Sequence, residues 1–242
     1  MSQPIALTRA QDDAEATAAA LAGLGYPAVV APAIEIVALT TRLPEGRFDA
    51  LIATSPRAVR ALGQRERHSL AATPLYVVGG RAAEAAAASG LSLASPPAED
   101  AATLAAQLRS TLKPVARLLY LAGRDRKPIL EAALAQAGHE VAAVELYAAQ
   151  ARAGWSAREA RAVAGCAAAL HYSRRTAALT LILAERAGLA APFRAMVHVC
   201  LSADVAAPLI AAGAARVVVA DRPDETRLLA ALEGALGSRS KD

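Results

Sequence analysis

Aromatic residues and cysteine are scarce in this sequence. Phe, Trp and Tyr make up 3% of its 242 residues, although hydrophobic residues make up 55%. The cores must therefore be built from Ala, Val, Leu and Ile, which suits helices packed on parallel sheets. Cys166 and Cys200 form no CxxC pair, and the four histidines show no HExxH spacing. We therefore expect no metal site and no disulfide scaffold. Both cysteines should be buried, and His171 and His198, in strand-like runs, should be core or strand-end residues.

The sequence also lacks a long hydrophobic run. Charged residues interrupt every candidate before it reaches the ~20 residues that a membrane-spanning helix needs. Glu185 and Arg186, for example, follow the apolar residues 179–184. The N-terminal residues contain no basic segment leading into an apolar one, so we expect no secretory signal. We expect a cytoplasmic protein that does not bind membranes.

Positive charge is in slight excess and is carried almost entirely by Arg. The net charge is +4, from 26 Lys and Arg against 22 Asp and Glu. Because Arg forms bidentate pairs with carboxylates and phosphates, an anionic ligand is one interpretation. The other is that most of these arginines only reflect a compositional bias. No basic run with interleaved aromatic residues is present, which disfavours nucleic-acid binding.

Standard catalytic motifs are absent as well. Residues 79–83 (GGRAA) do not form GxGxxG, and the sequence contains neither GxxxxGK[ST] nor GxSxG. These absences disfavour dinucleotide-binding, NTP-binding and α/β-hydrolase functions.

What the sequence does contain is a duplicated pattern, in which apolar runs end in small polar or glycine-rich loops. The matched segments are PIALTR (4–9) with RLLYLAGR (117–124), DALIATSPR (49–57) with AAALHYSRR (167–175), and PLYVVGG (74–80) with MVHVCLS (196–202). This pattern predicts two copies of one α/β unit. A site shared between two such units is the natural place for function.

Short β-rich runs alternate with Ala- and Leu-rich stretches that end in glycine, which is typical of βα units around a parallel sheet. Helices fill most of the intervals in this prediction, including 101–112 and 225–236, and each of these two begins after acidic residues. Glycines fall where helices should end, at Gly25, Gly90, Gly138, Gly188 and Gly213. Strands are expected at 5–8, 28–31, 50–53, 75–78, 118–121, 140–144, 168–172, 197–200 and 216–219.

Two stretches, 32–39 and 144–150, each extend a strand and then enter a segment of different composition. The chain could cross between domains at both. We therefore predict two similar parallel-sheet α/β domains joined by a two-stranded linker, the first domain being discontinuous. Paired extended linkers permit hinge motion. The predicted bounds are 1–33 and 152–242 for the first domain, 42–143 for the second, and 34–41 and 144–151 for the linker strands.

Six loops follow predicted strands and lead into predicted helices. Ligands of parallel α/β sheets bind at such loops, where unpaired N–H groups at helix N-termini attract anions. The alternative is that Ser and Thr at these positions, Ser55 and Ser173 above all, only cap helices. The residues expected to bind a ligand are Thr8, Arg9, Thr54, Ser55, Gly79, Gly80, Arg81, Gly123, Arg124, Ser173, Ser202 and Ala203.

The order of these features resembles the uroporphyrinogen-III synthase family. The resemblance covers essentially the whole chain and depends on the order and spacing of several short motifs. The motifs are TR (8–9), TSPRAV (54–59), VVGxxxAEAA followed by Gly90, YLAGRxRxxxLxxxLxxxGxxVxxxxxY (120–147), a second strand end with Ser173, and ADxPxExxLLxAL (220–232).

The resemblance implies two α/β domains with a two-stranded linker and a specific reaction. Family members close hydroxymethylbilane, a linear tetrapyrrole with eight carboxylates, to uroporphyrinogen III in haem biosynthesis. Ring D is inverted and water is lost. The resemblance implies no metal and no organic cofactor, and we expect a monomer. The alternative function is a non-catalytic, two-lobed cytoplasmic module that binds a small anionic ligand.

The resemblance also implies roles for particular residues. Tyr147 aligns with a tyrosine that the family places at its cleft, where it could donate a proton to the leaving hydroxyl. The alternative for Tyr147 is an aromatic residue at a strand edge. Arg9 and Arg124 could bind substrate carboxylates or form structural salt bridges. Ala82 and Val205 stand where the family often has Thr, so backbone N–H groups of 79–81 and 202–204 would carry the binding there.

Overall fold

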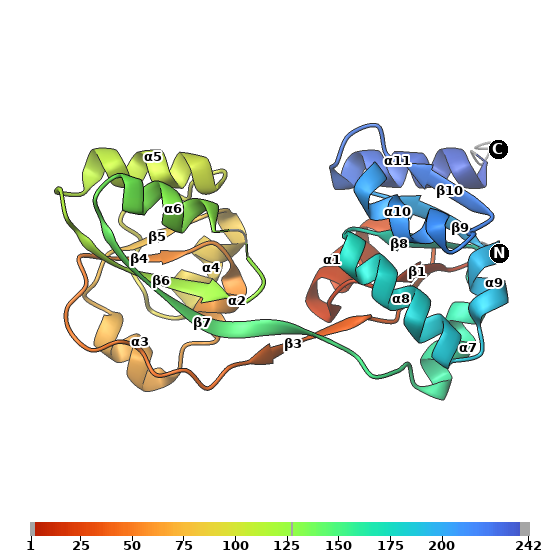
Figure 1. Cartoon of the computed structure of the whole chain (residues 1–242), viewed down its shortest axis with the longest axis horizontal. Coiled ribbons are helices and arrows are strands. Elements are labelled where there is room, and N and C mark those ends of the chain that lie inside the picture. Colours follow the sequence, from red (N-terminus) through yellow and green to blue (C-terminus); the bar gives the residue numbers. More distant parts are fainter. Residues whose placement is uncertain (1–2, 127, 238–242) are drawn as a thin grey trace. The chain divides into compact units, whose positions relative to one another are not determined.

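The structure is a computed structural model that describes residues 3–126 and 128–237. The chain forms two compact units (Figure 1). Unit 1 comprises Met1–Glu35 and Gln150–Asp242, and unit 2 comprises Ile36–Ala149. Residues 1–2 and 238–242, the ends of the predicted first domain, lie outside the described residues. The exact domain and linker bounds expected from the sequence stay predictions.

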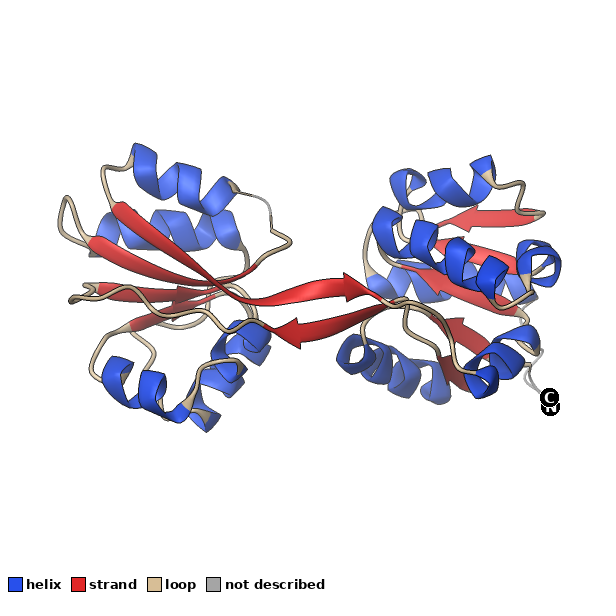
Figure 2. Ribbon diagram, turned by 60° about the horizontal axis from the view of Figure 1, so that its bottom comes forward, coloured by secondary structure: helices blue, strands red, loops and turns tan. Residues whose placement is uncertain are grey.

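Unit 1 is a five-stranded parallel sheet in the order β10-β9-β8-β1-β2. Its strands are β1 (Ile5–Leu7), β2 (Ala28–Val30), β8 (Ala168–His171), β9 (Val197–Cys200) and β10 (Arg216–Val219). Helices cover both faces (Figure 2). One face carries α1 (Gln11–Gly23) and α11 (Glu225–Leu236). The other carries α7 (Ala157–Ala164), α8 (Arg174–Arg186), α9 (Ala190–Ala195) and α10 (Ala203–Ala211).

Unit 2 has a sheet in the order β3-β7-β6-β4-β5, in which the pairs β4–β5, β4–β6 and β6–β7 are parallel. Its strands are β3 (Ile34–Ala38), β4 (Ala50–Ala53), β5 (Leu75–Val77), β6 (Arg117–Gly123) and β7 (Glu140–Ala151). The helices α5 (Ala101–Thr111) and α6 (Ile129–Gln136) cover one face. The other carries α2 (Pro56–Arg60), α3 (Gln64–Leu70) and α4 (Gly80–Ala88).

Both units therefore have the predicted α/β fold, with helices on two faces of a mainly parallel sheet. Strands β1, β4 and β8 are buried along their whole length, which explains their continuous apolar sequences. Alanine recurs on both faces of these strands and lets the helices approach closely. Cys166 and Cys200 are buried free thiols, as expected, and burial raises the pKa of each to about 12.

The two linker segments differ from the sequence prediction in their strands. Residues 34–38 do not extend β2. Strand β2 ends before Pro32, which has no N–H to donate within a sheet, and residues 34–38 form β3 in the other sheet. The strand expected at 140–144 continues to Ala151 as the 12-residue β7. The Leu39 N–H donates to Leu146 C=O, and the Arg152 N–H donates to Ala33 C=O. The residue numbers run in opposite directions at these two bonds, so β3 and β7 are antiparallel.

The strand orders reproduce the sequence duplication. Strands β9, β8, β1 and β2 are neighbours in unit 1, as β5, β4, β6 and β7 are in unit 2. Beyond β5, Leu93 and Ala98 form parallel bridges in the place that β10 takes beyond β9. The order of the strands along the chain differs between the two units, however. Unit 1 begins with β1 and β2, whereas their counterparts in unit 2, β6 and β7, come last.

Candidate active site

Each sheet has one point at which the direction of its connections reverses. In unit 1 this point lies between β1 and β8, since β1 leads to β2 on one side and β8 leads to β9 on the other. In unit 2 it lies between β4 and β6. Ligands of open α/β sheets bind at the carboxyl ends of the strands at such points. The residues following these strands are thus Thr8 and Tyr172 in unit 1, with Ser173 next in the chain, and Thr54 and Arg124 in unit 2.

The serines at the strand ends act as helix caps. Ser55 Oγ accepts from Arg57 N–H at 3.2 Å, Ser173 Oγ from Thr176 N–H at 3.1 Å, and Ser202 Oγ from Val205 N–H at 3.4 Å. Each bond satisfies one N–H group that a helix start would otherwise leave unpaired. The capping alternative is therefore correct for these hydroxyls, whether or not the neighbouring N–H groups also bind a ligand.

The loop after β5 differs from the three loops with capping serines. Gly79 precedes α4 with φ +78°, a conformation that strongly favours glycine, and without a side chain it cannot cap the helix. The first turn of α4 also contains no acidic residue, whereas α10 has Asp204 there, paired with Arg174 at 2.9 Å. The N-terminus of α4 therefore keeps more of its capacity to attract an anion.

The two positions at which Thr is replaced lie inside the cores. Ala82 on α4 is completely buried in the core of unit 2, and Val205 on α10 is buried in the core of unit 1. Each is the third residue of its helix and points toward the sheet. We therefore attribute their apolar character to packing.

The carboxyl edge of unit 1 is occupied by an internal polar network. The Arg9 guanidinium lies 3.9 Å above the Tyr172 ring, donates to Thr17 Oγ1 at 3.1 Å and lies 3.5 Å from Glu225. The Tyr172 hydroxyl donates to the same Glu225 carboxylate at 2.7 Å. Burial, and then the nearby Glu225, raise the pKa of Tyr172. Arg9 thus contacts residues of α1, of α11 and of the loop after β8. Its side chain is only 24% exposed.

Next to this network, unit 1 buries polar groups that face no solvent. The Thr8 side chain is 1% exposed, and its hydroxyl has no partner among the described residues. His171 Nε2 lies 3.0 Å from His198 Nδ1, and His198 Nε2 lies 2.9 Å from Phe193 C=O. Burial, and then His198, lower the pKa of His171 to about 3, and burial lowers that of His198 to about 4. Both rings are thus neutral core residues, in agreement with the sequence prediction.

The carboxyl edge of unit 2 brings Gly123 and Tyr147 together. The β6–β7 register shifts between Ala122 and Gly123, so that Gly123 lies opposite Tyr147. A Cβ atom on Gly123 would lie 2.5 Å from Tyr147 Cζ and 2.8 Å from its hydroxyl oxygen. The phenol therefore lies directly against the end of β6. It is half-buried, and within the part of the chain that the structure describes its hydroxyl has no hydrogen-bond partner.

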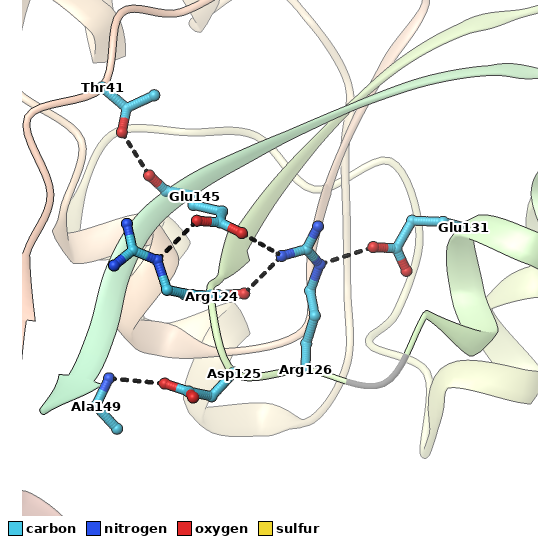
Figure 3. Close-up of polar contacts among 8 residues, drawn as sticks. Thr41, Arg124, Asp125, Arg126, Glu131, Glu145 and Ala149 are labelled. Atoms are coloured by element: carbon cyan, nitrogen blue, oxygen red, sulfur yellow. Dashed lines mark hydrogen bonds and ion pairs between the residues drawn. The ribbon is translucent and has the colours of Figure 1, made fainter. Parts of the chain in front are cut away.

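Two arginines of the loop after β6 bind one carboxylate of β7 (Figure 3). Arg124 Nε donates to Glu145 Oε2 at 3.0 Å, and Arg126 Nη1 lies 3.3 Å from Glu145 Oε1. Arg126 also donates to Glu131 at 2.7 Å and to Gly123 C=O at 2.9 Å. The hydrogen bond from Arg124 is the main cause that lowers the pKa of Glu145. Arg126 is thereby used internally, whereas the Arg124 side chain stays 56% exposed.

Thr54 contacts a second tyrosine of unit 2. Its hydroxyl lies 2.8 Å from the hydroxyl of Tyr120 on β6, and the Arg126 guanidinium lies 5.8 Å from the Tyr120 ring centre. Burial raises the pKa of Tyr120, and the Glu131 carboxylate acts in the same direction. Thr54, Tyr120 and Tyr147 therefore lie in one neighbourhood at the switch point of unit 2.

A family model described as uroporphyrinogen-III synthase HemD matches residues 15–230. The chain belongs to the uroporphyrinogen-III synthase family. It is thus an enzyme of the cyclising lyase type, with a role in haem biosynthesis. The alternative of a non-catalytic binding module is not favoured, because the family is one of enzymes.

Solved structures from the same family share the fold. The uroporphyrinogen-III synthetase from Helicobacter pylori has a TM-score of 0.66 and 16% identity, over 97% of this chain and 100% of that chain. A mutant uroporphyrinogen III synthase from the extremely thermophilic bacterium Thermus thermophilus has a TM-score of 0.51 and 18% identity, over 97% and 98%. A search of the curated proteins finds no match. At these identities the likeness supports the two-unit α/β fold.

No helix in residues 3–126 and 128–237 has the length and hydropathy to cross a membrane. In those same ranges, His, Cys, Asp and Glu side chains form no group of three that could hold a metal ion.

Several residues at the two edges were not singled out from the sequence. Glu145 lies two residues before Tyr147, a strand spacing that places both side chains on one face. Tyr120 begins the YLAGR motif, and Glu225 belongs to the ADxPxE motif. These spacings were signals for the family, but only the fold shows that Tyr172 binds Glu225 and that Tyr120 binds Thr54.

Proposed function

We propose that Tyr147 is the proton donor of this enzyme and that the substrate is hydroxymethylbilane. The observation that supports this role is the free phenol at the switch point of unit 2, beside Gly123. Tyr172 offers no equivalent, because its hydroxyl is bound to Glu225. A phenol is a weak acid, but it can donate a hydrogen bond that becomes a proton transfer to the leaving oxygen.

The proposed step removes the terminal hydroxyl of the substrate as water. The Tyr147 phenol gives its proton to that oxygen, and the C–O bond breaks as the adjacent pyrrole nitrogen supplies its electron pair. The resulting azafulvene is attacked by the substituted carbon of ring D, and the spiro intermediate fragments and closes again. The proton released when the final ring regains its aromaticity returns to the phenolate. The sum is the loss of one water.

We further propose that edge loops of both units bind the carboxylates of the substrate. In unit 2 the N-terminus of α4 supplies the N–H groups of Gly80 and Arg81 and a positive dipole end. The Gly79 N–H, also expected to bind, already donates to Ala98 C=O at 2.9 Å. Arg124 adds an exposed guanidinium that Glu145 orients through Nε alone. In unit 1 the starts of α8 and α10, at Ser173 and at Ser202 and Ala203, are the corresponding positions.

This arrangement suits a reaction in which the substrate carries most of the reactivity. Free hydroxymethylbilane closes without inversion to the type I isomer, so the protein must hold ring D where inversion is faster. Positioning of reacting groups can contribute several kcal/mol, up to roughly 7–11 in favourable cases. Thr8 and Arg9 contribute to this positioning from within unit 1, where both are largely buried.

The decisive experiment separates the porphyrin isomers formed by the purified protein. Freshly prepared hydroxymethylbilane is incubated with protein or with buffer alone, and the products are oxidised and resolved by chromatography. We expect the type III isomer to predominate with protein and the type I isomer without it. If the protein gives only type I product, in the amount of the buffer control, the proposed reaction is wrong. Binding without conversion would instead support the non-catalytic module.

We also propose that the protein is a cytoplasmic monomer. Each unit has its own complete core on both faces of its sheet, so neither needs a second copy to bury its apolar residues. The free thiols of Cys166 and Cys200 suit a reducing compartment. Light scattering coupled to size-exclusion chromatography tests the first statement, because a mass of twice 24.7 kDa would contradict it.

A further inference from the structure

The end of β6 is shaped around the ring of Tyr147. The register shift leaves Gly123 opposite Tyr147, and the phenol occupies the space that a side chain at position 123 would fill. The φ of Gly123 is not positive, so any residue could adopt its backbone conformation. Space for the Tyr147 phenol is therefore what requires a glycine at this position.

The loop after Gly123 is fastened to β7 on both sides of Tyr147 (Figure 3). Before Tyr147, the Glu145 carboxylate binds Arg124 and Arg126. At Tyr147 itself, the backbone C=O accepts from Arg124 N–H at 2.9 Å. After it, the Ala149 N–H donates to Asp125 Oδ2 at 3.0 Å. The loop thus continues the pairing of β6 with β7 beyond the register shift.

Arg126 links the Glu145 carboxylate to the backbone of Gly123. Its Nη1 donates to the Gly123 C=O at 2.9 Å and lies 3.3 Å from Glu145, while its Nε binds Glu131 at 2.7 Å. The side chain is mostly buried, and charge-assisted hydrogen bonds of this kind are strong. The position of the Gly123 backbone, and with it the surface against which the phenol lies, is therefore fixed by Arg126 and Glu145.

We infer that Gly123 is a positioning residue of the reaction, which leaves room for the Tyr147 phenol and is held in place by Glu145 through Arg126. The inference rests on the proposed role of Tyr147 as proton donor. Gly123 was expected from the sequence to bind substrate; here it acts through the tyrosine. A change at Gly123 should therefore alter the chemical step more than substrate binding.

The test is a Gly123→Ala variant with a matched control. The added methyl group displaces the phenol, and a displacement of about 1 Å can lower kcat about 100-fold. We expect kcat to fall by about 10–100-fold, with KM within about threefold of the wild-type value. The control is Gly234→Ala, which adds the same methyl group in open space on α11 and should leave kcat and KM unchanged.

A double-mutant cycle with Tyr147→Phe separates positioning from substrate contact. Without the hydroxyl there is no proton donor to position, so Gly123→Ala should lower kcat by less than about twofold in the Tyr147→Phe background. An undiminished effect in that background, or a rise in KM with kcat unchanged, would overturn the inference. If Tyr147→Phe itself reacts at the wild-type rate, the proposed proton donor is wrong instead.

Glu145→Gln provides a second route if Gly123→Ala does not fold. Gln keeps the size of the side chain but loses the charge that binds Arg124 and Arg126. We expect kcat to fall by about 3–10-fold in the wild-type background and to stay unchanged in the Tyr147→Phe background. Glu145→Asp, which keeps the charge, should recover part of the rate. Equal effects of Glu145→Gln in both backgrounds would contradict the inference.

Discussion

The carboxyl edges of the two sheets contain the same kinds of residue in different states. In unit 1, Arg9, Tyr172 and Glu225 bind one another, and the phenol is fixed as a donor to a carboxylate. In unit 2, Arg124 and Arg126 bind Glu145, and the phenol of Tyr147 has no hydrogen bond in the described part of the chain. The two tyrosines are not equivalent by position, since Tyr172 follows β8, whereas Tyr147 lies within β7.

The duplicated fold therefore has two edges with different side-chain contacts. Both edges keep an arginine after matched strands, β1 and β6, and both satisfy its charge with nearby acids. Of Tyr147 and Tyr172, only Tyr147 has a hydroxyl without a hydrogen-bond partner among the described residues. Unit 1 instead buries several polar side chains in its core, including the His171–His198 pair.

The largest expected difference between the units is their stability in acid. The folded pKa values of His171 and His198, about 3 and about 4, lie below the unfolded value of 6.5. The contribution of the two neutral histidines to the free energy of unfolding is therefore complete above pH 6.5. It is lost as the pH falls toward the folded pKa values. Between pH 6.5 and 5 the loss is on the order of 2 kcal/mol for each histidine. Below pH 4.5, Glu159, whose pKa the Arg152 hydrogen bond lowers to about 2, adds a further loss.

The single tryptophan reports on this region of unit 1. Trp155 contacts Phe193, which in turn packs against both histidine rings. On acidification, the fluorescence of Trp155 should change as unit 1 unfolds. The loss of far-UV circular dichroism that accompanies the unfolding of unit 2 should follow at a lower pH. The variant His171→Leu/His198→Leu should lose this separation, whereas His68→Ala, at an exposed histidine of unit 2, should keep it. Coincident transitions in the wild-type protein would refute the predicted difference.

A smaller difference is expected between the two matched arginines. Arg9→Gln removes a largely buried guanidinium from Thr17, Glu225 and the Tyr172 ring, and should lower the free energy of unfolding by about 2 kcal/mol. Arg124→Gln breaks an exposed ion pair, worth about 0–1 kcal/mol, and should instead raise KM. Urea unfolding and steady-state kinetics of both variants check this. Equal losses of stability in the two variants would show that both arginines have the same structural role, which would contradict this prediction.

The smallest predicted effect concerns backbone strain in unit 2. Val115 has φ +61°, and no other non-glycine residue in the described ranges has a positive φ. Its side chain is 77% exposed, so packing does not compensate for the strain. Val115→Asn should stabilise the protein by about 1 kcal/mol, because Asn tolerates this conformation better than a β-branched residue. Unchanged or lower stability in thermal unfolding would contradict this account.

The strands could be predicted because local patterns specify them. Apolar runs such as 50–53 and 197–200 are bounded by polar residues, and glycines with positive φ, such as Gly90 and Gly213, end the helices. Capping by Asp100 and Asp224 was equally visible, since an acidic residue precedes each helix. These features depend on neighbours in the sequence, and the structure confirms them.

The details of the site could not be predicted, because they depend on pairings between distant segments. The register shift at Gly123 arises only when β6 pairs with β7. The burial of Ala82 and Val205 depends on the rotation of α4 and α10 against their sheets. The state of each tyrosine depends on whether the fold brings a carboxylate to its hydroxyl, as Glu225 reaches Tyr172 from α11.

The most direct test of the central claim compares Tyr147→Phe with Tyr172→Phe in one assay of hydroxymethylbilane consumption and type III product. Both variants lose one hydroxyl group and keep the ring. Because general acid catalysis contributes about 100–10,000-fold, we predict that Tyr147→Phe lowers kcat at least about 100-fold. Tyr172→Phe should stay within about twofold of wild type and should only lower the unfolding temperature. Equal loss of turnover in the two variants, or a greater loss in Tyr172→Phe, would contradict the assignment of the chemistry to unit 2.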